Sequence, residues 1–241
     1  MIVHPIGMMR ANAAAGGDPV IVQIGDELGA AKRGLYDATD WTTLWQDTAG
    51  TTAVTAAGQT VKRIDDLSGN GFHLFAQGAT NAISRDGYVD WNNADFAMQS
   101  PGLLTTGLNK TLLFVMDPQA DTSFVFLGSD SSSGIYAGSA SSGSSGSAQG
   151  AAQTAVKYSI NDAADLSSPN AGALYTAIAA PSGWRSVALK DVSCDTVSAL
   201  FFGYQIKAEA QQYSGRVKYI VLAVSPTPTQ LSNIHTIWTT A

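Results

Sequence analysis

The stretch that decides the fold is Val61-Lys62-Arg63-Ile64-Asp65-Asp66-Leu67-Ser68-Gly69-Asn70-Gly71-Phe72-His73. Its first half has the composition of a short strand, and its second half that of a turn. Asp and Asn side chains close turns by accepting hydrogen bonds from nearby backbone N–H groups, and glycine adopts the positive φ angles that turns need. We therefore expect a strand over residues 61–67 that ends at a tight turn over residues 68–71.

Further short apolar runs, separated by turn residues, follow along the chain. Residues 88–91 alternate after the turn dipeptide Asp86-Gly87, and residues 111–116 are continuously apolar up to Asp117-Pro118. Strands are also expected over residues 124–128, 155–160, 174–178, 184–189, 199–204 and 215–224. Many short strands at near-regular spacing, without alternating helices, favour a β-sandwich or barrel over a doubly wound α/β sheet.

The composition supports a β-rich domain. Of the 241 residues 13% are charged, about half the usual share of about 25%. Glu favours helices over strands, and only Glu27 and Glu209 occur. The net charge is −6 and there is neither a basic run nor a long apolar stretch. We therefore expect no nucleic-acid binding, no membrane span and no secretion signal at the N-terminus.

The chain divides into two parts at about residue 34. Residues 1–34 hold Ala- and Gly-rich stretches around one apolar run, Pro19–Ile24, which could form a strand. We interpret these residues as an extended arm that anchors the protein on a partner. Residues 35–241 form the main domain. Within it, residues 139–150 are rich in Ser and Gly and are interpreted as a long exposed loop, the alternative being a linker between two domains.

The C-terminus predicts one short helix. Thr227-Pro228-Thr229-Gln230 places Thr at the N-cap, Pro at N1 and Gln at N3, which is a capping box. The apolar side chains that follow share one helical face; they are Leu231, Ile234, Ile237 and Trp238. We expect this helix to pack on a sheet edge or on the end of a sandwich.

Three segments together carry a family pattern. They are residues 35–40 with Leu44-Trp45-Gln46-Asp47-Thr48-Ala49-Gly50-Thr51-Thr52-Ala53-Val54, residues 61–74 with the turn Ser-Gly-Asn-Gly-Phe-His, and the strand from Gly215 before the capped helix. This pattern resembles the concanavalin A-like, laminin-G-like jelly-roll domains of phage and prophage virion proteins. The resemblance covers Leu35 to the C-terminus, and residues 35–74 are its specific part.

The resemblance implies a fold and a role. The fold is all-β, an antiparallel jelly-roll β-sandwich, here with an N-terminal arm and one C-terminal helix. The role is that of a non-enzymatic virion structural protein, displayed as a decoration, spike, fibre or tail component and contributing to host-surface adsorption. Such a protein is made in the bacterial cytoplasm and located in the virion. We expect it to contact other virion proteins through residues 1–34 and to form a homo-oligomer, a trimer or a pentamer.

A carbohydrate-binding module is the alternative function, and it is compatible with display on a particle. Apolar sugar faces stack on exposed aromatic rings, which offer a large apolar surface. Trp91, within Asp90-Trp91-Asn92, is the best candidate for such a ring, and a host glycan would be the partner. Trp184 and Trp238 lie in strand and helix patterns and are expected in the core.

The turn also holds the one candidate metal site. Asp65, Asp66 and Asn70 supply oxygen atoms of the kind that Ca²⁺ binds, but Ca²⁺ takes six to eight ligands. We therefore favour a structural turn, with Ca²⁺ as the alternative and no other cofactor.

Enzyme activity is not expected. The glucanases of this fold use a Glu-x-Asp-x-x-Glu strand that places carboxylates around the sugar bond, and no such motif occurs here. A glycoside hydrolase is thus the weakest alternative. The three histidines, His4, His73 and His235, are scattered, and Cys194 has no second cysteine with which to form a disulfide.

Overall fold

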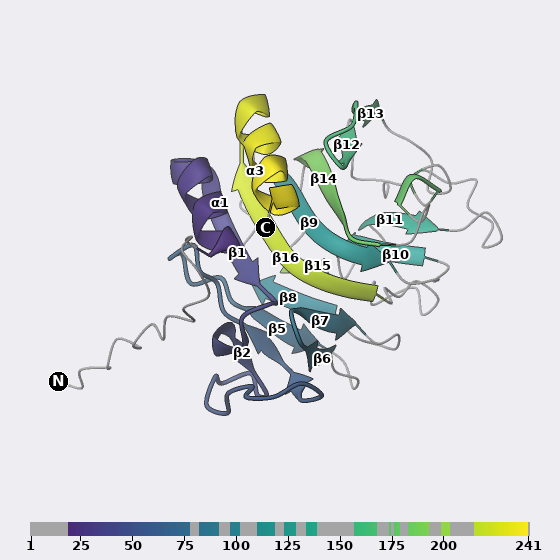
Figure 1. The fold of residues 1–241 in the computed structure, drawn as a ribbon. Helices are drawn as coiled ribbons and strands as arrows, with labels where there is room; N and C mark the ends of the chain where they lie inside the picture. The colour runs from purple at the N-terminus through teal and green to yellow at the C-terminus, as the bar shows by residue number, and fades with distance from the viewer. Residues whose placement is uncertain are drawn as a thin grey trace.

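The computed structural model describes residues 19–77, 82–91, 97–101, 110–118, 123–128, 134–138, 157–167, 174, 176–178, 183–192, 199–202 and 215–240. These residues form two antiparallel β-sheets, with α1 (Val20–Leu28) and α3 (Pro228–Thr240) at the two ends of the described chain (Figure 1). Two 3₁₀ turns, η1 (Gly29–Ala31) and η2 (Trp41–Thr43), flank the first strand. The prediction of a mostly antiparallel β-protein with a short C-terminal helix is confirmed.

The larger sheet has nine strands among the described residues. Adjacent strands are, in order, β13 (Leu166–Ser167), β12 (Lys157–Ile160), β14 (Arg185–Val192), β9 (Lys110–Pro118), β16 (Gly215–Val224), β7 (Tyr88–Trp91), β6 (Ala82–Arg85) and β3 (Thr60–Val61). The remaining strand, β1 (Lys32–Asp37), pairs with residues 219–223 of β16, whereas β7 pairs with residues 215–217. Because β9 pairs along the other edge of β16, β1 and β7 lie end to end on one edge.

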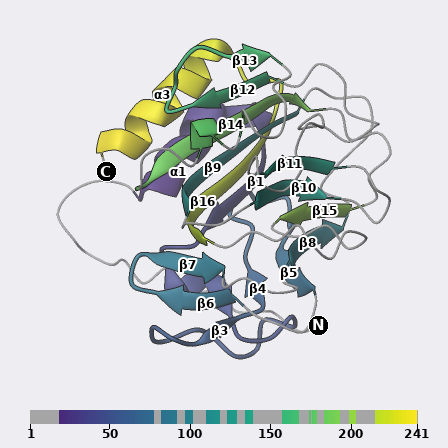
Figure 2. The ribbon, with the colours of Figure 1, turned by 90° about the vertical axis from the view of Figure 1, so that its right-hand side faces the viewer.

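The smaller sheet has seven strands in the described part of the chain. Their order is β11 (Gly134–Gly138), β10 (Ser123–Gly128), β15 (Ala199–Phe202), β8 (Ala97–Pro101), β5 (Leu74–Gln77), β4 (Arg63–Ile64) and β2 (Leu44–Trp45). Figure 2 shows this sheet beside the strands β14, β9 and β16 of the larger one.

The two sheets share one hydrophobic core. Successive side chains of a strand point to opposite faces, and the inward ones from both sheets meet in a single cluster. Ile64 and Leu74 enter it from the smaller sheet, and Phe114 and Leu222 enter it from the larger sheet. All four are at most 4% exposed. The shared core therefore holds the two sheets together.

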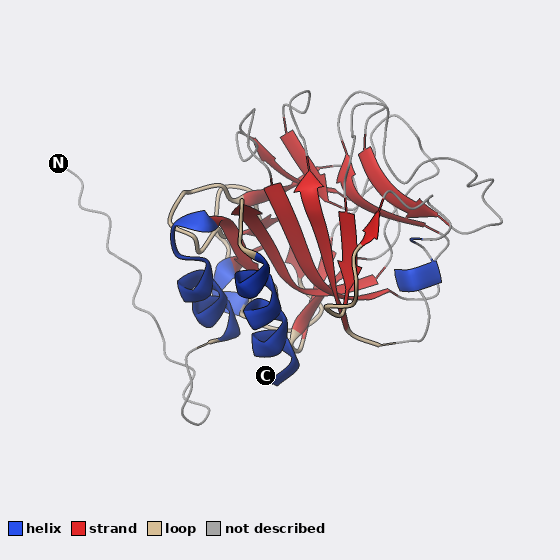
Figure 3. Ribbon diagram, turned by 90° about the horizontal axis from the view of Figure 1, so that it is seen from above, coloured by secondary structure: helices blue, strands red, loops and turns tan. Residues whose placement is uncertain are grey.

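A second cluster lies on the outer face of the larger sheet, under the two helices. Ile24 of α1 and Ile234 of α3 pack there against Leu113, Val221 and other outward side chains of β9 and β16. Figure 3 shows the helices side by side against the sheet. Because residues 112–114 alternate between the two clusters, both faces of β9 are buried. This explains why its sequence is apolar throughout.

The predicted capping box of the C-terminal helix is confirmed. The Gln230 N–H donates to Thr227 Oγ1 at 3.2 Å, and the Thr227 N–H donates to Gln230 Oε1 at 2.9 Å. The predicted apolar face also packs, since its four side chains all belong to the second cluster. The expected location was wrong, because α3 lies over the face of the larger sheet and not at an edge. The outward apolar side chains of β9 and β16 provide the surface that receives it.

The expectation of a strand over Pro19–Ile24 was wrong, because these residues begin α1. Ile21, Ile24 and Leu28 share one helical face and are buried under α3, so tertiary packing outweighs the strand preference of the β-branched side chains. For the same reason, residues 20–34 are not an extended arm: they form α1, η1 and the start of β1. Residues 1–18 of the predicted arm lie outside the described residues.

The other strand predictions have different outcomes. Strands occupy residues 88–91 and 215–224 as predicted. The prediction of one strand over residues 61–67 was wrong, because Val61 ends β3, Arg63 and Ile64 form β4, and residues 65–67 lie outside strands. The predicted strand 174–178 was wrong, since residues 174 and 176–178 are helical. The predicted loop at residues 139–150 lies outside the described residues.

Candidate functional site

The outer face of the larger sheet carries a group of aromatic and basic side chains beyond the helices. We call Tyr88, Trp184, Arg216 and Lys218 the aromatic patch. Trp184 is 38% exposed and is one of the few exposed large hydrophobic residues among those described. The other three side chains are half-buried. An exposed indole ring on a sheet face is available to a ligand.

Strand alternation places these side chains on the outer face. In β7, Val89 and Trp91 are buried in the shared core. Tyr88, the first residue of this strand, therefore points to the outer face. In β16, Val217 is in the core, and Arg216 and Lys218 flank it. Arg216 lies opposite residue 90 of β7 on one side and residue 117 of β9 on the other. The sheet register thus brings three strands together at this position.

Ring and cation contacts hold the aromatic patch together. The rings of Tyr88 and Trp184 meet edge to face, with centroids 5.8 Å apart. Lys218 Nζ lies 4.6 Å from the centroid of the Trp184 ring, and Arg216 Cζ lies 5.3 Å from that of Tyr88. Cations at such distances over an aromatic face are attracted by its negative potential. Each ring is therefore oriented by a neighbouring ring and by a cation.

Two carboxylates pair with Arg216 of the patch and with Arg85, which lies opposite Tyr88 in the sheet. Arg216 Nη1 lies 3.4 Å from Asp117 Oδ2, and Arg85 Nε lies 3.5 Å from Asp90 Oδ2. Asp117 also accepts a hydrogen bond from the N–H of Gly183 at 3.3 Å, next to Trp184. Beneath them, burial lowers the pKa of the Arg185 guanidinium, and Asp117 acts in the opposite direction. The carboxylates thus fix the backbone and the arginines beside the exposed ring.

Trp91 and Trp184 differ from the prediction in their exposure to solvent. The prediction that Trp91 is an exposed sugar-stacking ring was wrong, because Trp91 is 2% exposed and belongs to the shared core. The prediction that Trp184 is in the core was also wrong. Of the neighbours of Trp91, Asp90 is half-buried beside Arg85, and Asn92 lies outside the described residues. Trp238, expected in the core, is half-buried in the cluster under the helices.

The turn after β4 joins the two sheets. Asp66 Oδ1 accepts from the N–H of Leu35 in β1 at 3.1 Å and from that of Ser68 at 2.9 Å. Asp66 Oδ2 accepts from the hydroxyl of Ser68 at 2.8 Å and from the N–H of Phe72 at 3.0 Å. The Tyr36 hydroxyl of β1 donates to the carbonyl of Phe72 at 2.6 Å. Since β1 belongs to the larger sheet and β4 to the smaller, this turn has a structural role.

The candidate calcium ligands are engaged in this turn. Asp65 accepts from Arg63 Nε at 2.7 Å and from Trp45 Nε1 at 2.8 Å, while Asn70 Nδ2 donates to the Arg33 carbonyl at 3.1 Å. Because Asp66 accepts four hydrogen bonds, a cation there would have to replace N–H and O–H groups that already bind this carboxylate. In the described part of the chain, no group of three or more His, Cys, Asp or Glu side chains is arranged to hold a metal ion.

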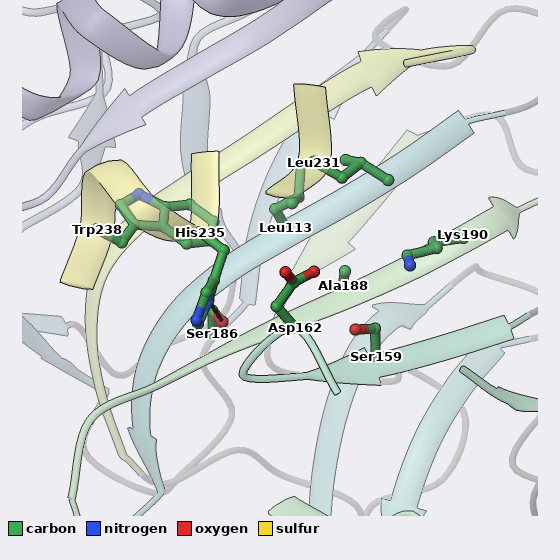
Figure 4. A pocket seen from close by; sticks show the side chains of 9 residues that line it. All are labelled: Leu113, Ser159, Asp162, Ser186, Ala188, Lys190, Leu231, His235 and Trp238. Atoms are coloured by element: carbon green, nitrogen blue, oxygen red, sulfur yellow. Dashed lines mark hydrogen bonds between the residues drawn. The ribbon is translucent and has the colours of Figure 1, made fainter. Parts of the chain in front are cut away.

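A small pocket lies between α3 and the outer face of β14 (Figure 4). Ser186 Oγ and His235 Nδ1 are 2.9 Å apart at its wall, and Asp162 accepts from the hydroxyl of Ser232 at 3.0 Å. A serine beside a histidine has the geometry of a nucleophile and its base. The space open to the centres of water molecules is about 20 Å³, which is enough for one or two waters and too small for a sugar ring.

The two glutamates have different surroundings. Glu27, on α1, accepts from Asn233 Nδ2 of α3 at 3.1 Å, and Glu209 lies outside the described residues. The Glu27 carboxylate thus links α1 to α3.

Comparison of the chain with protein-family models, with curated proteins and with solved structures gave no match. Among the described residues, no helix is both long and apolar enough to cross a membrane.

Proposed function

We propose that the chain is a non-enzymatic structural protein of a phage-like virion, built on a concanavalin A-like jelly-roll domain, and that its outer face binds a carbohydrate. The virion assignment is supported by the resemblance over residues 35–74. In the structure this segment contains the turn at Asp66, which hydrogen-bonds β1 to the connection between β4 and β5. The segment on which the resemblance depends is therefore also a segment on which the association of the sheets depends.

Carbohydrate binding is carried by one observation, the exposed Trp184 ring held between Tyr88 and Lys218. A pyranose presents C–H groups on one face and hydroxyls at its rim. An exposed indole can bury the C–H face, and nearby charged side chains can hydrogen-bond the hydroxyls. The aromatic patch supplies both kinds of group on the outer side of the larger sheet. On a particle, such a face would serve adsorption to a host surface.

The virion role is tested on particles from the bacterial strain that carries the coding sequence. We expect the chain to co-purify with particles through a density gradient, and a gold-labelled antibody to place it on the head or the tail. Absence of the chain from purified particles would contradict the virion role.

Anchoring on other virion proteins is proposed for the N-terminal segment, residues 1–34. Because α1 packs on the sheet through Ile21, Ile24 and Leu28, its contact with a partner would use residues 1–18 or the outer side of α1, where Val22 is 42% exposed. A chain that lacks residues 1–18 should fold, and it should remain outside particles if those residues make the contact and join them if the outer side of α1 does. Light scattering of the full chain tests the proposed homo-oligomer, and a monomer would contradict it.

Carbohydrate binding is tested on a glycan array with the wild-type chain and the Trp184→Ala variant. We expect binding by the wild type and loss of binding by Trp184→Ala. Leu67→Ala is the matched control, because Leu67 is an exposed apolar residue, 43% exposed, outside the aromatic patch. If the wild type binds no glycan, carbohydrate binding is wrong, whatever the result on particles.

A further inference from the structure

We infer that the aromatic patch selects sugars that carry an anionic group, with Lys218 as the residue that recognises the charge. This inference rests on the proposed carbohydrate binding and names its ligand class. The chain as a whole is acidic, with a net charge of −6 and 13 basic residues in 241. Three of those basic residues, Arg85, Arg216 and Lys218, nevertheless gather around the two rings of the patch.

Lys218 differs from the two arginines in its ion pairs. Each arginine lies within 3.5 Å of a carboxylate, Asp90 or Asp117. Among the described residues, Lys218 has no carboxylate within ion-pair distance, and its ammonium contacts the Trp184 ring. An ammonium group has three N–H donors, and a ring face satisfies them less completely than an anion. An incoming anion can therefore pair with Lys218 without displacing a carboxylate of the described residues.

The position of Lys218 links charge recognition to stacking. Its Nζ lies over the indole, 4.6 Å from the ring centre, so a sugar that packs beside the ammonium on the same side of Trp184 would hold its rim substituents close to it. A neutral sugar would gain only hydrogen bonds there. A carboxylate or sulfate would gain a charge-assisted hydrogen bond, which is roughly twice as strong as a neutral one.

Aromatic rings with basic neighbours also occur in single-stranded nucleic-acid sites. Two observations favour a sugar over a nucleic acid here. Asp90 and Asp117 lie within the same group of side chains, and a chain of phosphates would meet both of them. The net charge of −6 also opposes the approach of a polyanion. A short saccharide with one anionic group meets these repulsions less strongly, because it carries a single charge.

The experiment measures binding to matched pairs of glycans. An array first presents neutral glycans beside copies that differ only by a sialic acid, a uronic acid or a sulfate. Calorimetry then compares the best pair, with a dT oligonucleotide in a parallel titration. We expect the acidic member to bind at least about tenfold more tightly than the neutral one. Its affinity should fall as salt rises from about 0.05 to about 0.5 M, because salt screens the ion pair.

Three variants test which basic side chain causes the preference for the acidic glycan. Lys218→Met should retain the neutral glycan and reduce the preference for the acidic member to about twofold or less. Lys157→Met is the matched control, because Lys157 is an exposed lysine, 50% exposed, on β12 and paired with Asp191. Arg85→Met tests whether a cation already paired with a carboxylate contributes, and we expect a small effect. Thermal unfolding of each variant confirms that the fold is intact.

Each outcome has a defined meaning. Equal binding of both members of a pair through Trp184 overturns the inference and leaves carbohydrate binding in place. A preference for the acidic member that survives Lys218→Met overturns the role of Lys218. No binding to any glycan, or tighter binding of the oligonucleotide, overturns the inference together with carbohydrate binding.

Discussion

The side-chain amide of Gln230, in the first turn of α3, donates from Nε2 to the backbone carbonyl of Glu27, in the last turn of α1, at 2.8 Å. The same amide accepts from the N–H of Thr227 through Oε1. One side chain therefore caps the start of one helix and the end of the other, at groups that a helix leaves without internal partners.

The two roles of Gln230 can be separated by substitution. Gln230→Ala removes both and should lower the free energy of unfolding by about 1–2 kcal/mol. Gln230→Glu keeps the acceptor for Thr227, loses the donor to Glu27 and should lose about half as much. Urea denaturation measures both, with Thr229→Ala as a control at an exposed helix position. Equal stability of Gln230→Ala and the wild type would show that the link does not contribute.

Asp66 should be the most sensitive polar residue of the turn. It is 8% exposed and accepts four hydrogen bonds. Asp66→Asn directs an NH₂ group toward two donors, and the expected loss of stability is about 2–4 kcal/mol. Asp86→Asn, at an exposed turn, should change stability by less than about 0.5 kcal/mol. Thermal and urea unfolding give both values; similar losses for the two variants would argue against the linking role of the turn.

Truncation distinguishes the folded part of the N-terminal segment from the rest. A chain that starts at Pro19 keeps α1 and should unfold cooperatively. A chain that starts at Leu35 loses α1 and the beginning of β1, and it exposes Leu113 and Val221 of the second cluster. We expect it to be insoluble or unfolded, since Ile24→Ala alone should cost about 2–4 kcal/mol. Circular dichroism decides, and a folded chain from Leu35 would show that α1 is dispensable.

Asp37 should make the stability depend on pH. Burial raises the pKa of its carboxyl, and hydrogen bonds from Thr39 act in the opposite direction. The folded chain thus holds this proton more tightly than the unfolded chain, whose pKa is about 3.9. The stabilisation is complete below that value and is lost as the pH rises through the raised pKa of the folded state.

Asp37→Asn removes this titration, and its amide oxygen can still accept from Thr39. We expect its stability relative to the wild type to increase as the pH rises above about 4 and then to level off. Urea denaturation at a series of pH values measures the difference, in which the other carboxyls cancel. A difference that stays constant with pH would contradict the assignment.

Part of the candidate site follows from the alternation of side chains along the strands. Tyr88–Trp91 was predicted as an alternating strand, and in such a strand Trp91 shares a face with Val89, which indicates burial. By the same argument Trp184 shares a face with Ser186 and not with Val187 or Leu189. The alternation therefore predicts which side chains of each strand face the core and which face outward. It does not predict the contact of Trp184 with Tyr88 and Lys218, because this contact depends on the pairing of strands far apart in the chain.

The helix at Val20–Leu28 illustrates the other limit. Its β-branched residues favour a strand locally, although Ile21, Ile24 and Leu28 follow the spacing of one helical face and Gly29 ends the helix. The helix forms because β9, β16 and α3 provide an apolar surface for that face. This surface comes from distant parts of the chain, so it cannot be predicted from the local sequence. The capping box at Thr227, by contrast, is a local interaction and was predicted in full.

The pairing of β1 with β16 has a consequence for biosynthesis. The first described strand finds its neighbour near the end of the chain, and the contact of Gln230 with Glu27 spans 203 residues. Contacts so distant in sequence form slowly, because the chain between them must first be ordered. On the ribosome, β1 has no partner along this edge until residues 219–223 have emerged. Final assembly of the larger sheet therefore waits for β16, and chaperones have access to the unpaired strand until then.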